Sequence, residues 1–137
     1  MNNRHIELSK YRLDEAKNCI NTAESNISIG DYKSAANRSY YAMFHCVRAV
    51  LALDEVDFKK HMQVIGYFRK EYIKSGVMKT VFSDYLGNAF EVRGKSDYED
   101  FYMISKKDVE QQVNNAKEFY EAVELYLADK WNMEPIA

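Results

Sequence analysis

The chain has 137 residues, a formal net charge of −2 at pH 7, 47% hydrophobic residues and 29% charged residues. This length and composition suit one ordered domain with a single core and exclude an intrinsically disordered chain. Proteins that bind nucleic acid over a broad surface carry a clear basic excess, so the slightly acidic charge leaves room only for a local contact with RNA or DNA.

Apolar residues recur with helical spacing along most of the sequence, and no segment shows the sustained alternation of a strand. Gly30 and Gly94 stand where the first and fourth helices are expected to end, and Asp31 can cap the second. The predicted helices cover residues 4–28, 32–53, 60–74, 78–93 and 105 to about 130. We therefore expect an all-α, up-and-down bundle of about five helices, with one domain over residues 1–130 and a flexible tail over 131–137.

The second predicted helix contains the stretch NRSYYAMFHCVRAVL and has two unlike faces. One face is an ordinary core stripe of Tyr40, Met43, Phe44, Val47, Val50 and Leu51. The other carries Arg38, Tyr41 and His45 among alanines, where a solvated helix would carry lysines and glutamates. Another helix, a second subunit or a ligand is expected to approach this face closely, and the alanines favour a dimer over a monomer. In the alternative, Arg38 pairs with an acid of a neighbouring helix and His45 hydrogen-bonds a backbone carbonyl.

Two further polar clusters carry candidate groups. Lys60 and His61 stand at the start of the third predicted helix, where free backbone N–H groups favour a phosphate, although a solvated turn is the alternative. Arg93, at the end of the fourth predicted helix, is followed by Asp97 and Tyr98 in a predicted loop. These three residues offer a phosphate grip, a proton acceptor and a hydroxyl, and the alternative is a local ion pair between Arg93 and Asp97.

The sequence gives no signal for a metal or a cofactor. Cys19 and Cys46 are too few and too far apart for a zinc knuckle, and we expect them to be reduced core residues. The first residues lack the apolar region of a signal peptide, and no run approaches the roughly 18 residues of a membrane span. The expectation is a cytoplasmic protein without membrane contact, metal or cofactor.

Three stretches in this order resemble the HEPN superfamily, specifically its small stand-alone prokaryotic members: NRSYYAMFHCVRAVL, the Lys-Lys-His turn followed by V-I-x-Y-F, and FEVRGKSDYEDFY. The resemblance covers about residues 5–129. It implies a helical bundle that commonly forms a homodimer and is often encoded beside a minimal nucleotidyltransferase, as a toxin and antitoxin pair. Many HEPN proteins are metal-independent endoribonucleases with an R-x(4–6)-H motif late in the chain, while others bind nucleotides or act only as partners.

Arg93 fills the late position of that motif, but no histidine follows it, and Asp97 and Tyr98 stand there instead. Arg38 and His45 have the spacing R-x6-H, but they lie on the second helix. We therefore predict one composite polar cleft, within a subunit or across a dimer. Its candidate catalytic residues are Arg93, Asp97, Tyr98 and His45, and its candidate ligand-binding residues are Arg38, Tyr41, Lys60 and His61.

The predicted function is that of the HEPN module of a nucleotidyltransferase and HEPN pair, toxin-antitoxin-like, which binds a nucleotide or RNA in this cleft. A non-catalytic helical protein for dimerisation or partner binding explains the acidic charge and the missing histidine equally well. A metal-independent endoribonuclease is the second alternative, and the sequence leaves open whether the chain is an enzyme.

Overall fold

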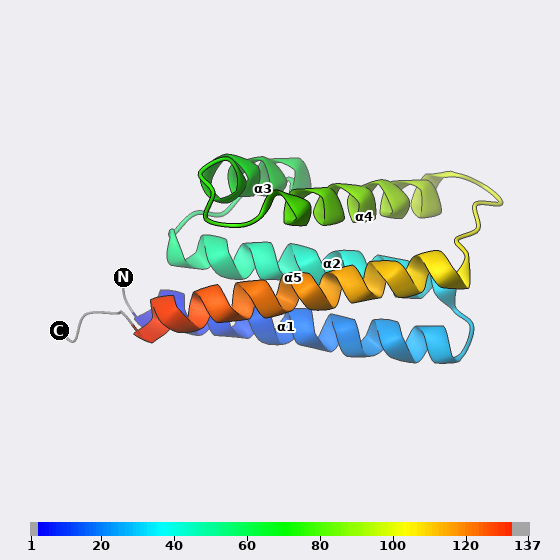
Figure 1. Cartoon of the computed structure of the whole chain (residues 1–137), viewed down its shortest axis with the longest axis horizontal. Coiled ribbons are helices and arrows are strands. Elements are labelled where there is room, and N and C mark those ends of the chain that lie inside the picture. The colour runs from blue at the N-terminus through cyan, green and yellow to red at the C-terminus, as the bar shows by residue number, and fades with distance from the viewer. Residues whose placement is uncertain (1–2, 133–137) are drawn as a thin grey trace.

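The computed structural model describes residues 3–132 as a set of helices joined by short connections (Figure 1). The elements are α1 (Asn3–Ser28), α2 (Tyr32–Leu53), α3 (His61–Phe68), the short π-helix η1 (Arg69–Ile73), α4 (Thr80–Tyr98) and α5 (Lys106–Asn132). The predicted all-α bundle is confirmed, and no strand occurs among the described residues. Within residues 3–132, no helix combines the length and the apolar character needed to cross a bilayer.

The long helices form a layered bundle with α2 at its centre. α1 and α5 lie side by side and run in opposite directions, and α4 lies over the pair formed by α2 and α5 (Figure 1). α3 and η1 sit at one end of α4 and cross the direction of the long helices. Because α2 contacts α1, α3, α4 and α5, it must present small or apolar side chains on nearly every side.

The alanine-rich face of α2 is covered by α1 of the same chain. Ala42 and Ala49 are fully buried, and the Ser9 hydroxyl of α1 donates a hydrogen bond to the Ala49 carbonyl at 2.8 Å. Arg12, one turn further along α1, donates to the Arg48 carbonyl at 2.9 Å. The close neighbour predicted from the sequence is therefore α1, and these alanines give no evidence for a dimer.

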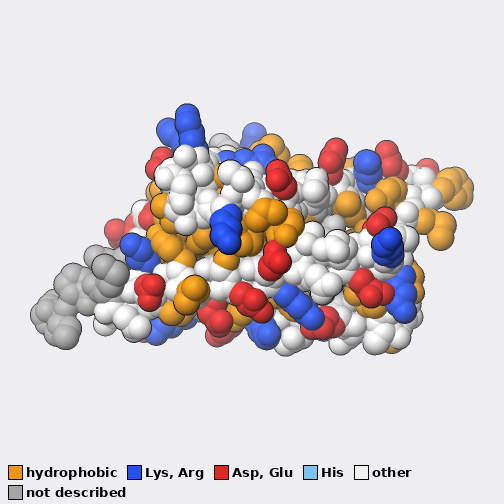
Figure 2. Space-filling view, viewed as in Figure 1, with side chains coloured by type: hydrophobic (Ala, Val, Ile, Leu, Met, Phe, Trp, Pro, Cys, Tyr) orange, Lys and Arg blue, Asp and Glu red, His pale blue; other side chains and the backbone are white. Residues whose placement is uncertain are grey.

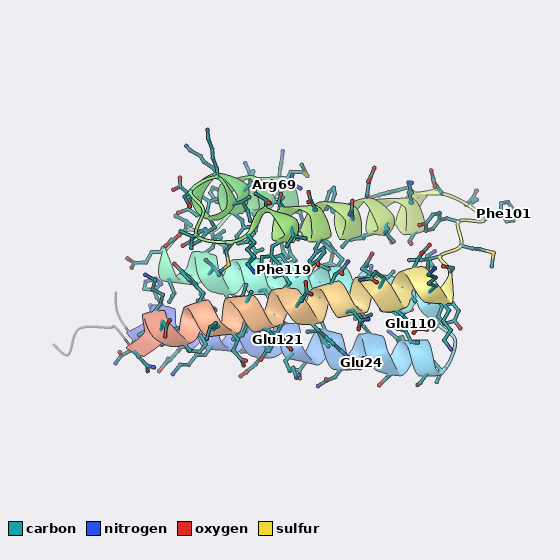
Figure 3. All side chains as sticks on the ribbon, in the orientation of Figure 1. Glu24, Arg69, Phe101, Glu110, Phe119 and Glu121 are labelled. Atoms are coloured by element: carbon teal, nitrogen blue, oxygen red, sulfur yellow. The ribbon has the colours of Figure 1, made fainter. Side chains whose placement is uncertain are left out.

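An aromatic core joins the upper and lower layers. Phe119 of α5 points between α5 and α4 (Figure 3), where its ring centroid lies 5.8 Å from that of Phe68 and 5.4 Å from that of Phe82. Burying one such ring contributes about 1.5–3 kcal/mol to stability. Cys19 and Cys46 are buried and free, as predicted.

Asp54, at the end of α2, fixes the position of α3 and η1. Its Oδ2 atom accepts hydrogen bonds from the Tyr67 hydroxyl of α3 at 3.1 Å and from the Tyr72 hydroxyl of η1 at 2.5 Å. Burial, followed by the Asp54 charge, raises the pKa of Tyr67 to about 12 and also raises that of Tyr72, so both hydroxyls keep their protons and donate. These two hydrogen bonds hold α3, the helix that begins at His61, against the end of α2.

The end of α4 differs from the prediction. Gly30 ends α1 with a φ of 79°, but Gly94 lies inside α4, which continues to Tyr98. A glycine inside a helix costs only about 1 kcal/mol relative to alanine, so neighbouring contacts can carry the helix past it. Asp97 and Tyr98 therefore occupy the last turn of α4, and the connection to α5 is correspondingly shorter than the predicted loop.

The C-terminal helix extends further than expected. Trp131 and Asn132, which the sequence assigned to the tail, belong to α5, and the Trp131 indole N–H donates to the Ser9 hydroxyl at 3.1 Å. The rest of the predicted tail, residues 133–137, lies outside the described residues.

Candidate functional site

Polar and aromatic side chains of α2, α3 and α4 meet in one group. We call it the guanidinium–aromatic cluster, and it consists of Arg38, Tyr40, Tyr41, Phe44 and His45 of α2, His61 of α3, and Arg93 of α4. Arg38, Tyr41 and His45 share one side of α2, and Tyr40 and Phe44 share the adjoining side, because spacings of three and four residues return to the same face. The Tyr41 ring joins the two sides, with its centroid 5.2 Å from that of Tyr40 and 6.3 Å from that of Phe44. α3 and α4 both pack on α2, which brings His61 and Arg93 to these residues.

Two guanidinium groups contact the ring of Tyr41. The Cζ atom of Arg38 lies 5.0 Å from the Tyr41 centroid, and the Cζ atom of Arg93 lies 5.2 Å from the same centroid. Arg93 also covers the Tyr40 ring at 5.5 Å. The π-face of each ring attracts a cation, but two like charges on one ring repel each other. An anion that reaches both arginines would relieve that repulsion.

The hydrogen bonds within the described residues leave both arginines with spare N–H donors. Arg38 donates from Nη2 to the Asn37 side chain at 2.9 Å and from Nη1 to the Cys19 sulfur at 3.9 Å, and both of these partners are neutral. The Nε atom of Arg93 lies 3.6 Å from Asp97 Oδ2, so the local ion pair that the sequence offered as the alternative is present. That separation exceeds a normal hydrogen-bond length, and within residues 3–132 the buried Nε has no hydrogen-bond partner.

His61 connects α3 to the cluster. Its Nδ1 atom lies 2.8 Å from the Tyr40 hydroxyl, and its ring stacks on Phe44 with centroids 4.0 Å apart. Burial, and then the positive charges of Arg93 and Arg48, lower the pKa of His61, whereas burial raises the pKa of Tyr40. His61 is therefore neutral and Tyr40 protonated near pH 7, as a hydrogen bond from the phenol to the imidazole requires.

His45 lies beside Tyr41, with ring centroids 6.1 Å apart. Burial is the main cause that lowers the pKa of His45. The charge of Glu15 opposes this shift, and the nearby charges of Arg48, Arg38 and Arg12 add to it. The cluster thus contains two neutral imidazoles, which can accept or donate a proton near neutral pH.

Of the other predicted site residues, Asp97 reaches the cluster through its ion pair with Arg93, and two do not reach it. Tyr98 is 88% exposed at the end of α4, and Lys60 is exposed at the residue before α3. The neighbouring Lys59, not Lys60, lines the hollow beside His61. The catalytic and ligand-binding roles of all eight residues remain predictions.

Tyr40 and Phe44 belong to the predicted core stripe of α2. Their contacts with His61, a hydrogen bond from one and ring stacking from the other, were not predicted from the sequence. One signal was present for Tyr40. A tyrosine in a buried stripe carries a hydroxyl that needs a hydrogen-bond partner, whereas phenylalanine would fill the same space without one. Phe44 carried no such signal.

Exposed apolar side chains gather beyond the cluster, where α4 is joined to α5. Tyr98 is 88%, Phe101 100% and Met103 88% exposed. Figure 2 shows hydrophobic side chains at this end of the molecule, and Figure 3 shows Phe101 pointing away from the bundle. Elsewhere on the face in Figure 2, acidic and basic side chains are interspersed, as the small net charge implies.

The described residues hold no group of three or more histidine, cysteine, aspartate or glutamate side chains placed to bind a metal ion.

The fold and the cluster together define an all-α bundle with a cationic and aromatic site built on its central helix. The family model described as "HEPN domain" matches residues 9–126, and the chain belongs to the HEPN family. The expectation drawn from its motifs is thereby confirmed.

Relatives with related names share most of the chain. A protein of Methanocaldococcus jannaschii named "Putative toxin" is 31% identical over 90% of this chain and 84% of its own length. A UPF0332 protein of Thermotoga maritima is 28% identical over 93% of this chain and 96% of its own length. A second M. jannaschii protein with the same "Putative toxin" name is 30% identical over 66% of this chain and 73% of its own length. The similarity therefore extends over most of the bundle.

Proposed function

We propose that this chain is the toxin-like HEPN member of a two-protein pair and that its guanidinium–aromatic cluster binds the phosphate of an RNA strand or a nucleotide. The observation that carries this proposal is the position of two arginines on one tyrosine ring. Arg38 and Arg93 lie 5.0 and 5.2 Å from the Tyr41 centroid, and each retains N–H donors. A phosphate accepts several such donors and neutralises their charge, and arginine is the side chain best shaped for this contact.

The surroundings favour an anion at this position. Asp97 is the acid that pairs with Arg93, and its side chain is 37% exposed, so solvent screens its charge. The neutral His61 can add a hydrogen bond without adding the cost of burying another charge. Binding is proposed ahead of cleavage because no histidine follows Arg93 in the position that the ribonuclease motif requires.

Fluorescence anisotropy of a labelled single-stranded RNA, with unlabelled AMP as competitor, tests the proposal. Arg93→Ala is expected to weaken RNA binding by about tenfold or more, since a hydrogen bond to a charged group contributes roughly 1.5–3 kcal/mol. Arg93→Lys keeps the charge but loses the planar donor set, so its affinity should lie between those of Arg93→Ala and the wild type. Lys95→Ala is the matched control, because it removes one exposed positive charge from the same helix.

Circular dichroism should show that each variant retains the helical fold, because Arg93 also packs on two tyrosine rings. Equal loss of affinity in Lys95→Ala and Arg93→Ala would show that only total charge matters. Unchanged affinity in a folded Arg93→Ala protein would refute a phosphate site at the cluster.

A second candidate function is partner binding without an RNA ligand, and the exposed Tyr98, Phe101 and Met103 favour it. We propose that this apolar tip contacts the antitoxin, a minimal nucleotidyltransferase, and that the chain acts as a homodimer in the cytoplasm. The antitoxin follows from the toxin names of relatives, and the nucleotidyltransferase and the dimer follow from the HEPN resemblance.

Expression of the chain should slow bacterial growth, and co-expression of a nucleotidyltransferase encoded beside it should restore growth. Phe101→Ser should abolish co-purification of the two proteins, whereas Lys107→Ser, on the neighbouring first turn of α5, should not. Light scattering after gel filtration measures the dimer directly. Growth arrest that the neighbouring protein does not relieve would contradict the pairing.

A further inference from the structure

An open pocket lies next to the guanidinium–aromatic cluster, at the junction of α2, α3 and the segment that joins them. It has a volume of about 400 Å³ and is lined by Phe44, Arg48, Asp57, Phe58, Lys59 and His61. His61 belongs to both sites, because it lines the pocket and is hydrogen-bonded to Tyr40 in the cluster. The pocket and the cluster are therefore adjacent, and the His61 imidazole lies between them.

Positive charge prevails around the pocket although the whole chain is acidic. Asp57 is the carboxylate in the lining, and its Oδ2 atom is shared by Arg48 at 3.1 Å and Arg12 at 3.4 Å. Lys59 adds a third cation, and its side chain is exposed at the pocket. The Nε atom of Arg48 is buried without a hydrogen-bond partner among the described residues. Three cations around one carboxylate leave a net positive field in the pocket.

Aromatic rings supply the rest of the lining. His61 is stacked on Phe44, which anchors the imidazole, and Phe58 packs on Tyr67 with ring centroids 5.7 Å apart. Phe58 and His61 both remain partly exposed. Flat rings beside cations are the combination that binds single-stranded nucleic acid, in which bases stack on aromatic side chains and phosphates contact lysine and arginine.

We propose that this pocket binds a second nucleotide, next to the one whose phosphate lies at the cluster. This inference rests on the proposed function. Its base packs against Phe58 and His61, and its phosphate contacts Arg48 and Lys59. The ligand is then a single-stranded RNA of at least two nucleotides, because a paired base is held in its duplex and does not enter a side pocket.

Anisotropy with a labelled single-stranded RNA and with a duplex of the same sequence tests the inference. Phe58→Leu retains an apolar side chain against Tyr67 but removes the flat ring, so affinity for the single strand should fall by about fivefold or more. Phe58→Tyr restores a ring and should bind like the wild type. The duplex should bind more weakly than the single strand to the wild type and should respond little to Phe58→Leu.

The salt dependence of binding tests the phosphate contact separately. Lys59→Ala should reduce the slope of log affinity against log salt by about 0.7, the value for one lost phosphate contact on a single strand. Lys70→Ala removes another exposed lysine, on η1, and should leave the slope unchanged. Because Lys59 is exposed, this readout holds even if Phe58→Leu fails to fold.

The outcomes separate the pocket from the cluster. If Arg93→Ala weakens binding but Lys59→Ala leaves both the affinity and the salt slope unchanged, the second subsite is refuted and the proposed function stands. If the wild type binds neither the RNA nor AMP, both are refuted. A loss in Lys59→Ala with its reduced slope, together with unchanged binding in Lys70→Ala, supports the subsite.

Discussion

Replacing Tyr40 by phenylalanine tests the structure of the cluster with the smallest available change. The substitution removes the hydroxyl that lies 2.8 Å from His61 Nδ1 and leaves the ring in place. That ring keeps its contact with the Arg93 guanidinium at 5.5 Å and its packing on Phe90, with centroids 5.8 Å apart. Any effect of the variant therefore reports on one hydrogen bond.

The expected loss of stability is about 1 kcal/mol. A typical hydrogen bond contributes roughly 0.5–1.5 kcal/mol net, and water can reach the partly exposed His61 to replace the missing donor in part. With an unfolding entropy of about 2.1 cal/mol/K per residue, a chain of this size loses about 3.5 °C in Tm for each kcal/mol. By the same principle, Tyr40→Phe should melt about 3.5 °C below the wild type.

The same substitution should change the protonation chemistry of His61. We expect the buried phenol to donate to Nδ1 and the neutral imidazole to carry its hydrogen on Nε2. A hydrogen bond to the neutral form opposes protonation, and its removal is expected to raise the pKa of His61.

Thermal unfolding followed by circular dichroism measures the first effect, and NMR of the imidazole nitrogens measures the second. Tyr11→Phe is the control, because Tyr11 is 61% exposed on α1 and the variant should melt like the wild type. A wild-type His61 that carries its hydrogen on Nδ1 would refute this direction of the hydrogen bond. Equal Tm and equal His61 pKa in Tyr40→Phe and the wild type would refute the hydrogen bond itself.

Three further predictions concern stability. Burial lowers the pKa of His45 and of His61 below the ordinary value of 6.5, so the unfolded chain binds more protons in that range. The two neutral histidines contribute to the free energy of unfolding in full above about pH 6.5, and this contribution is lost as the pH falls through their folded pKa values. Replacing both by glutamine should therefore reduce the fall in Tm at acidic pH. Asp54→Ala removes the acceptor of two tyrosine hydroxyls and should cost about 1–3 kcal/mol in urea unfolding, whereas an equal loss in Asp54→Asn would show that its charge is needed. Phe119→Ala should cost about 3–5 kcal/mol, against less than about 0.5 kcal/mol for Leu125→Ala, which is 70% exposed on the same helix.

Several elements were predictable because their signals are local. The bounds of α2 match the prediction because Asp31 accepts a hydrogen bond from the Ser34 N–H at 3.2 Å, which is the cap that its sequence position indicated. Gly94 carried the same kind of signal as Gly30, yet α4 runs through it. A glycine permits a helix end without requiring one, and the neighbouring contacts decide.

The all-α bundle of the HEPN type could be predicted from the amino-acid sequence, and so could the shared side of Arg38, Tyr41 and His45 on its second helix. Periodicity and capping depend on neighbouring residues, so they can be read from the sequence. Three features could be seen only in the folded chain: α1 covers the alanines of α2, Arg93 joins Arg38 on the ring of Tyr41, and Lys59, not Lys60, lines the pocket beside His61. These contacts depend on how each helix is rotated about its axis and where it crosses α2, and packing among residues far apart in the sequence sets both.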